Sequence, residues 1–141
     1  MKSISHFILA VTLLLIVASC KKDSKEDLTP RGILTSHGWK VASMTQLNNI
    51  IPGYDYEIAD CRLDDCMIFK SDGTYKTNIG SIKCNNNETE KTGTWSLSED
   101  GNIFTLSESS AYCSMKSINP TSMILLWKYS GYEFESTYVP C

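Results

Sequence analysis

The sequence predicts an all-β fold, an eight-stranded antiparallel up-and-down barrel with a short N-terminal helix. The chain has 141 residues, which is enough for one domain with a hydrophobic core. About eight segments show the apolar–polar alternation of strands, and short turn signals separate most of them. Closure of such a meander into a barrel removes the exposed edges that an open sheet would leave. A barrel of this size either holds one small ligand or is filled by its own side chains.

A short helix is expected ahead of the first strand. Thr29 is suited to cap its N-terminus, and Pro30 fits the first helical position. The helix would run through about Ser36, and a positive φ at Gly38 would end it. The apolar pair at residues 33–34 would then face the core.

Strand patterns fill most of the remaining chain. The first strand begins at Trp39, and the irregular stretch after it, residues 46–60, is a candidate lid. Asp100-Gly101 is a strong signal for a hairpin between two later strands. The eight expected strands lie at about residues 39–44, 67–69, 75–77, 92–98, 103–107, 112–118, 122–129 and 132–139.

The first 19 residues have the features of a signal peptide. Lys2 precedes an unbroken apolar run over residues 7–17, which is too short for a comfortable transmembrane helix. The segment ends in VASC, whose cysteine is Cys20, and this ending resembles the bacterial lipobox. The resemblance implies cleavage before Cys20 and acylation of its thiol with palmitate-type chains, which would anchor the protein in a membrane. The alternative is an ordinary secretory signal that ends near a chance cysteine.

Residues 20–28 carry the cysteine and a mixed-charge segment that indicates a flexible tether to a domain over residues 29–141. Lysine rather than aspartate follows Cys20, which resembles lipoproteins sent to the outer membrane. The charged residues also resemble the surface-export signals of Bacteroidetes lipoproteins, although a plain linker explains them equally well. We therefore expect an outer-membrane lipoprotein, on the periplasmic face or on the cell surface.

Composition argues against several classes of function. The net charge is −3 and the folded part has no basic cluster, so we expect no nucleic-acid partner. His37 is the one histidine after residue 20, and we expect no enzyme activity, no cofactor and no metal site. Asp64-Asp65 could bind Ca²⁺, but the sequence lacks the spaced oxygen ligands and the glycine of a calcium loop. Hydrogen bonding of these two carboxylates to backbone N–H groups at a strand entry is the favoured interpretation.

A series of short motifs runs through the domain in a characteristic order. The motifs are Trp39, Cys61-x-x-Asp64-Asp65, Phe69, Asp72-Gly73-Thr74-Tyr75, Cys84 and Gly93-Thr94-Trp95-Ser96-Leu97. Their order and spacing resemble those of the bacterial lipocalin-like lipoproteins common in Bacteroidetes, from about residue 34 to the end. The resemblance implies an eight-stranded calyx behind a short helix. It also implies a disulfide between Cys61 and Cys84, which a meander can bring to the same end of the barrel.

The other cysteines allow a second disulfide. With Cys20 acylated, five of the six cysteines remain, so at least one of them is free or pairs between chains. We expect Cys66 to pair with Cys113, because both lie near the start of a strand at the same end of the barrel. Cys141 would then be left over, and a reactive thiol is the alternative role for it.

Two functions follow from these patterns. The favoured one is a non-enzymatic, membrane-anchored, lipocalin-like lipoprotein that binds a small hydrophobic ligand. The alternative is a structural or protein-interaction module of the cell envelope with a filled barrel and an unidentified protein partner. Seven inward aromatic residues could line the ligand cavity or form a solid core: Trp39, Phe69, Tyr75, Trp95, Trp127, Phe134 and Tyr138.

Overall fold

The computed structural model describes residues 28–48, 54–109 and 111–141, so the whole barrel lies after residue 27. The predicted signal peptide over residues 1–19, the predicted acylation site at Cys20 and most of the predicted tether lie outside the described residues. Within the described part of the chain, none of the helices combines the length and the hydrophobicity needed to cross a membrane.

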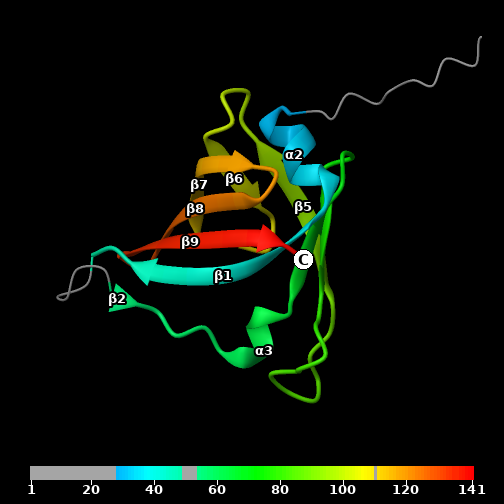
Figure 1. The fold of residues 1–141 in the computed structure, drawn as a ribbon, viewed down its shortest axis with the longest axis vertical. Helices are drawn as coiled ribbons and strands as arrows, with labels where there is room; N and C mark the ends of the chain where they lie inside the picture. The colour runs from blue at the N-terminus through cyan, green and yellow to red at the C-terminus, as the bar shows by residue number, and fades with distance from the viewer. Residues whose placement is uncertain (1–27, 49–53, 110) are drawn as a thin grey trace, which may run out of the picture.

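Eight antiparallel strands close into an up-and-down barrel, as the sequence predicts (Figure 1). The ring follows chain order and closes where β1 pairs with β9. β2 has only two residues, pairs with the far end of β1 and is not part of the ring. The elements are α2 (Pro30–Ser36), β1 (Gly38–Gln46), β2 (Tyr54–Asp55), α3 (Asp60–Leu63), β3 (Cys66–Phe69), β4 (Thr74–Asn78), β5 (Lys91–Leu97), β6 (Ile103–Leu106), β7 (Tyr112–Asn119), β8 (Ser122–Tyr129) and β9 (Tyr132–Pro140).

The helix begins as expected but ends differently. Thr29 accepts a hydrogen bond from the Gly32 amide at 3.1 Å, which caps the N-terminus of α2. At the other end, His37 is already extended, with φ −154°, and Gly38 is the first residue of β1. Gly38 does not have a positive φ, so the expectation that it ends the helix is wrong.

Three tight turns depend on glycine. Gly73, Gly101 and Gly131 have φ values of 85°, 74° and 85°, a region that other residues enter at a cost. Gly73 and Gly101 each follow an aspartate and Gly131 follows Ser130, so the Asp-Gly and Ser-Gly pairs mark the hairpins correctly. These turns keep successive strands adjacent and set the order of the ring.

One end of the barrel is filled by an aromatic cluster. The ring centroid of Phe69 lies 5.9 Å from that of Tyr75, 5.9 Å from that of Trp95 and 5.5 Å from that of Phe104. All four side chains are buried and belong to the hydrophobic core. The contacts of Phe69 with Trp95 and Phe104 are edge-to-face, and such contacts stabilise beyond the burial of area alone.

Helix α2 covers the same end. Trp39 donates a hydrogen bond from Nε1 to the carbonyl oxygen of Leu34, at 3.1 Å, and both side chains are fully buried. The Arg31 guanidinium lies 4.7 Å from the ring centroid of Trp95. We call α2 and the cluster of Phe69, Tyr75, Trp95 and Phe104 the filled end.

Two disulfides cross-link the described chain. Cys61 pairs with Cys84, which is the pairing that the family resemblance implies. Cys66 pairs with Cys141, so the expected bond between Cys66 and Cys113 is wrong. Cys113 is a free, buried thiol in the core.

The alternation of side chains explains the second pairing. Met67 faces the barrel interior, so its neighbour Cys66 faces outward and cannot reach the buried Cys113. Cys141 follows β9, which lies on the other side of β1 from β3, and its amide donates to the Gly38 carbonyl at 3.1 Å. The Cys66–Cys141 disulfide therefore crosses over β1 at Gly38. A Cβ at Gly38 would lie 2.3 Å from Cys66 Sγ and 3.2 Å from Cys141 Sγ, so glycine leaves room for the bridge.

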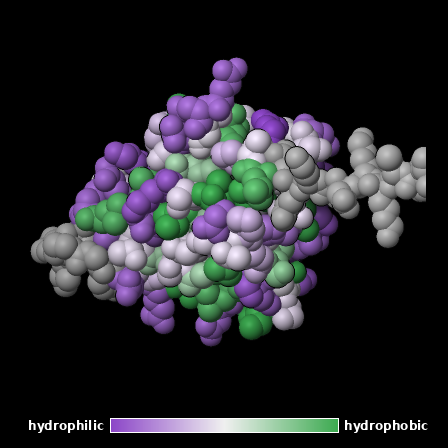
Figure 2. Space-filling view, turned by 45° about the horizontal axis from the view of Figure 1, so that its top comes forward, coloured by the Kyte–Doolittle hydropathy of each residue, from purple (hydrophilic) through white to green (hydrophobic). Residues whose placement is uncertain are grey.

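The outer surface gives little reason to look for a broad hydrophobic contact area on the side shown in Figure 2. Over the described residues of this face, hydrophobic side chains lie in several small groups among hydrophilic ones (Figure 2). Scattered apolar residues are normal on a protein surface. The interior of the barrel, which contains a cavity, is the better place to look for a binding site.

Candidate functional site

A cavity of about 420 Å³ opens beside the filled end. Its volume falls within the range of roughly 300–1,000 Å³ that is usual for small-molecule sites. The barrel wall contributes residues from β1, β3, β4 and β9, and the segment over residues 56–65 contributes the rest. The lining consists of Trp39, Val41, Met44, Tyr56, Glu57, Ile58, Ala59, Arg62, Asp65, Met67, Thr77 and Tyr138.

The boundary between the filled end and the cavity falls between neighbouring inward positions. On β3, Phe69 joins the aromatic cluster, whereas Met67 lines the cavity. On β4, Tyr75 belongs to the cluster, whereas Thr77 lines the cavity. A change of one inward position along either strand thus separates packed core from open space.

The cavity forms where the barrel wall is incomplete. β3 pairs with β1 only at Gly38 and Trp39, whereas β9 pairs with β1 from Trp39 to Gln46. Residues 56–65, which we call the cover segment, line the cavity on this side. The Tyr56 amide donates to the Met44 carbonyl at 2.7 Å and fixes the start of the cover segment against β1. Within the stretch 46–60 that the sequence indicates as a candidate lid, residues 56–59 line the cavity, whereas residues 49–53 lie outside the described ranges.

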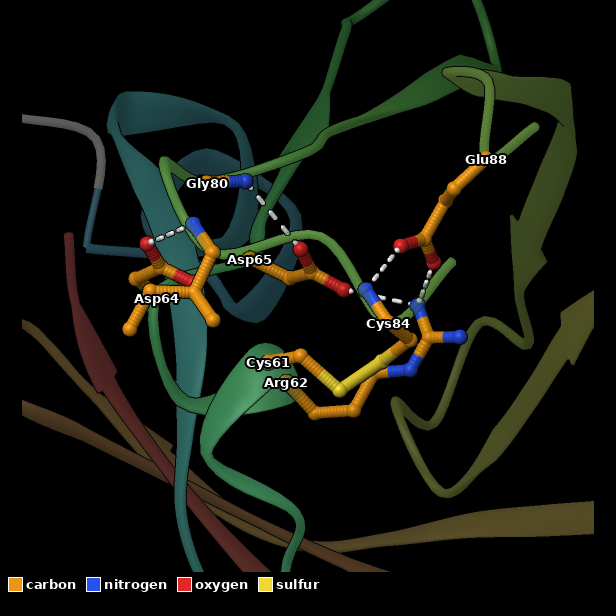
Figure 3. Close-up of a disulfide and its surroundings, with 8 residues drawn as sticks. Cys61, Arg62, Asp64, Asp65, Gly80, Cys84 and Glu88 are labelled. Atoms are coloured by element: carbon orange, nitrogen blue, oxygen red, sulfur yellow. Dashed lines mark hydrogen bonds and ion pairs between the residues drawn. A yellow bond between two sulfur atoms is a disulfide. The ribbon is translucent and has the colours of Figure 1, made fainter. Parts of the chain in front are cut away.

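The far end of the cover segment is cross-linked to the crossing between β4 and β5. Figure 3 shows the Cys61–Cys84 disulfide beside a set of hydrogen bonds to carboxylates. Asp64 Oδ2 accepts from the amides of Ser81, at 2.6 Å, and of Ile82, at 3.2 Å. These contacts hold the cover segment in place from outside the barrel.

Asp64 and Asp65 therefore serve as acceptors for backbone groups at the entry to β3. Asp65 Oδ1 accepts from the Gly80 amide at 3.2 Å. Desolvation raises the pKa of Asp64, but hydrogen bonds from Ile82 and Ser81 outweigh it, so the pKa lies below its ordinary value. In the described part of the chain, no group of three or more potential metal ligands comes together.

A short ion-pair network borders the cavity. Arg62 Nη1 lies 3.0 Å from Asp65 Oδ2 and also pairs with Glu88 Oε1 (Figure 3). Arg62 is 42% exposed, whereas the side chains of Asp65 and Glu88 are only 11% and 6% exposed. The hydrogen bond to Asp65, with the one to Glu88, raises the pKa of Arg62 against the effect of desolvation. Glu57 is a further carboxylate in the cavity lining.

Two of the seven aromatic residues predicted as ligand-lining reach the cavity, namely Trp39 and Tyr138. Phe69, Tyr75 and Trp95 do not line the cavity but pack in the filled end, which is the solid-core alternative that the sequence left open.

The last two predicted residues also lie outside the lining. Trp127 packs against the core, and Phe134 makes an edge contact with Tyr56, with ring centroids 5.9 Å apart. Phe134 thus contacts the cover segment without lining the cavity.

Sequence analysis missed most of the lining. Met67 shares a face of its strand with Phe69, so its inward direction could have been inferred. Strict alternation from Trp39 would turn Met44 outward, and Met44 reaches the cavity because β1 has an irregularity between Val41 and Ser43. Ile58 and Arg62 lie in the irregular stretch and α3, where no periodicity indicates which side chains face the barrel. Their role depends on the early separation of β3 from β1, which only the tertiary structure shows.

His37 and the free thiol of Cys113 lie away from the cavity lining. His37 follows α2, hydrogen-bonds Ser36 Oγ at 2.7 Å and has its ring centroid 4.3 Å from that of Trp39. Burial raises the pKa of the Cys113 thiol to about 12, so it stays protonated and is a poor nucleophile at neutral pH. Burial also raises the pKa of Tyr138 well above its usual range.

Comparison with known families gives one match. A family model described as a lipocalin-like domain matches residues 36–125, from the end of α2 into β8. The matched range includes β1, β3, β4 and the whole cover segment, and thus most of the cavity. No curated protein and no solved structure matches the chain.

Proposed function

The chain belongs to the lipocalin-like domain family, and from this premise we propose that it binds a small hydrophobic molecule in the cavity under the cover segment. The observation that supports the proposal most directly is the cavity itself. Its walls are formed mainly by apolar and aromatic side chains, among them Trp39, Met44, Met67 and Tyr138. Burial of apolar ligand surface against such walls contributes about 25 cal/mol per Å² before the costs of association.

The division of the barrel supports ligand binding over the alternative of a filled interaction module. A filled barrel would extend the aromatic cluster to both ends. Here the cluster stops at Phe69 and Tyr75, and smaller or more flexible side chains follow at Met67 and Thr77. Methionine adapts its shape to different apolar partners, which suits a site for a hydrophobic ligand.

The proposal includes a membrane anchor and no catalytic step. Cys20 would carry the lipid after removal of residues 1–19, and residues 20–28 would link it to α2. The domain would then lie beside the outer membrane, a source of hydrophobic molecules. Mass spectrometry of the protein from a host with lipoprotein processing would test the anchor. Acylation should disappear in a Cys20→Ser variant, and an unacylated wild-type protein would contradict this part of the proposal.

Native mass spectrometry of residues 21–141, a segment that contains every described residue, tests ligand binding. The protein should come from an oxidising compartment, so that both disulfides form. A bound small molecule, or uptake of a neutral fluorescent dye that responds to apolar surroundings, would support the proposal. An empty protein that takes up no hydrophobic probe would contradict it.

A pair of variants on β4 locates the site. Thr77→Phe would add volume inside the cavity, whereas Lys76→Phe would add the same ring on the opposite side of the strand. We expect Thr77→Phe to reduce dye uptake by about tenfold and Lys76→Phe to leave it unchanged, since only the first removes ligand space. Equal effects of the two variants would place the dye elsewhere.

A further inference from the structure

Charged side chains at the cavity indicate which class of hydrophobic ligand it prefers. Three residues that are charged at neutral pH line it, namely Glu57, Arg62 and Asp65, and Glu88 joins the network through Arg62. This group contains three carboxylates and one guanidinium. The local charge therefore favours a cationic or neutral ligand over an anionic one.

Arg62 is already engaged and cannot easily receive the carboxylate of a ligand. It pairs with Asp65 at 3.0 Å and with Glu88, and both carboxylates also accept backbone hydrogen bonds. Gly80 donates to Asp65 at 3.2 Å, and Cys84 donates to Glu88 at 2.8 Å (Figure 3). An anion that replaced either partner would leave a largely buried carboxylate without its counter-charge, which is strongly unfavourable.

Glu57 is the acidic group that a ligand can reach. It is exposed and lines the cavity, and it makes no salt bridge with any residue in the ranges that the structure describes. Its neighbours along the cover segment, Tyr56 and Ile58, line the cavity as well. A charge held by Glu57 would therefore lie at the mouth, with apolar space beside it.

The aromatic walls suit the same class of ligand. Tyr56 adjoins Glu57 in the cover segment and lines the cavity, and the face of such a ring attracts an ammonium group. Trp39 and Tyr138 line the cavity as well and suit the apolar chain of the ligand. Aromatic walls and a free carboxylate thus favour the same charge.

We infer that the cavity binds amphiphilic cations, such as lipophilic amines, with the apolar chain in the cavity and the ammonium group at Glu57. This inference rests on the proposed function, since it names the ligand class of the same site. Fatty acids of the same chain length should bind more weakly, because their carboxylate would meet Glu57 and Asp65.

Three probes with the same ten-carbon chain test the inference: decylamine, decanol and decanoate. Each competes with a neutral dye for residues 21–141 at pH 7 and low ionic strength. We expect decylamine to bind about tenfold more tightly than decanoate, with decanol between them, as for a mouth carboxylate that attracts one charge and repels the other. Decanoate binding as tightly as decylamine would overturn the inference but leave hydrophobic binding intact. Failure of all three probes would instead contradict the proposed function.

A matched pair of substitutions assigns the preference to its residue. Glu57→Gln should weaken decylamine binding about threefold and leave decanol unchanged. Glu99→Gln makes the same change on the turn between β5 and β6, outside the cavity lining, and should change neither. Equal loss of amine binding in both variants would overturn the role of Glu57. Added salt should reduce the difference between amine and acid, because it screens exposed charges.

Discussion

The filled end and the cavity use the same strands for opposite purposes. On β3, the Phe69 side chain is almost completely buried among other aromatic side chains, whereas Met67, two residues earlier, lines the cavity. The filled end is covered by a helix of the same chain, and the cavity by a segment held by a disulfide and carboxylates. Stability and binding can therefore reside in different parts of one small barrel. Variants that separate the two properties test this division.

The largest expected effect is on the stability of the filled end. Phe69→Ala should lower the free energy of unfolding by about 4 kcal/mol, because it leaves a cavity among three aromatic rings. Met67→Ala on the same strand should cost only about 1–2 kcal/mol, since that side chain already borders space. Denaturant unfolding followed by tryptophan fluorescence measures both. Similar losses would show that the two regions do not differ in packing.

Removal of the Cys61–Cys84 disulfide should affect both stability and binding. Alanine at both positions should cost about 3 kcal/mol, from the entropy that the unfolded chain regains. It should also weaken ligand binding, because the cover segment loses its anchor beside Arg62.

The matched control removes Cys66 and Cys141 together. That bond closes a longer loop, so its loss should cost about 4 kcal/mol while affecting ligand affinity less. Dye titration under conditions in which each variant is folded measures the effect on ligand affinity separately from the effect on stability. Equal changes in affinity would argue against a special role of the cover segment.

Gly38→Ala tests the bridge over β1. The new methyl group would overlap Cys66 Sγ and should cost about 2 kcal/mol. In a background with alanine at Cys66 and Cys141, the same substitution should cost much less, and a double-mutant cycle measures the coupling. An equal cost in both backgrounds would mean that something other than the disulfide requires glycine here.

The smallest expected effect concerns pH. Because the folded state lowers the pKa of Asp64, its stabilising contribution is present above the ordinary carboxylate pKa of 3.8 and is lost as the pH falls through the lower folded value. Wild type should therefore lose more stability between pH 7 and pH 3 than Asp64→Asn does. Asp72→Asn provides a comparison at the filled end, where the hydrogen bonds from Thr74 lower the pKa of Asp72. Only the Asp64 variant should change how ligand affinity depends on pH.

Sequence analysis predicted the barrel because its strands and turns are marked locally. The Asp-Gly pair at Gly101 and the alternation around Trp95 need only neighbouring residues to be interpreted. The pairing of Cys61 with Cys84 came from resemblance to a family, which carries tertiary information that local patterns lack. The family match and the closed ring confirm the fold class.

Sequence analysis failed where the outcome depends on non-adjacent strands. The partner of Cys66 is set by the position of β3 and β9 on either side of β1, together with the outward direction of its side chain. The same applies to Gly38. Glycine is needed there because a Cβ would collide with the disulfide, and not because the backbone has a positive φ. The cavity lining depends on how early β3 leaves β1, and no residue pattern in the chain marks that point.

The Cys66–Cys141 bridge also determines how the domain would respond to mechanical tension. A pull between its two ends would pass along the chain to Cys66 and then directly through the disulfide to Cys141. Strands β3 to β9 lie in the closed loop between these cysteines and would carry none of that tension. Extension could release β1 and the cover segment, about 3.5 Å for each residue freed, while most of the barrel stayed off the stretched path. Reduction of one bond would expose the remaining strands to the force.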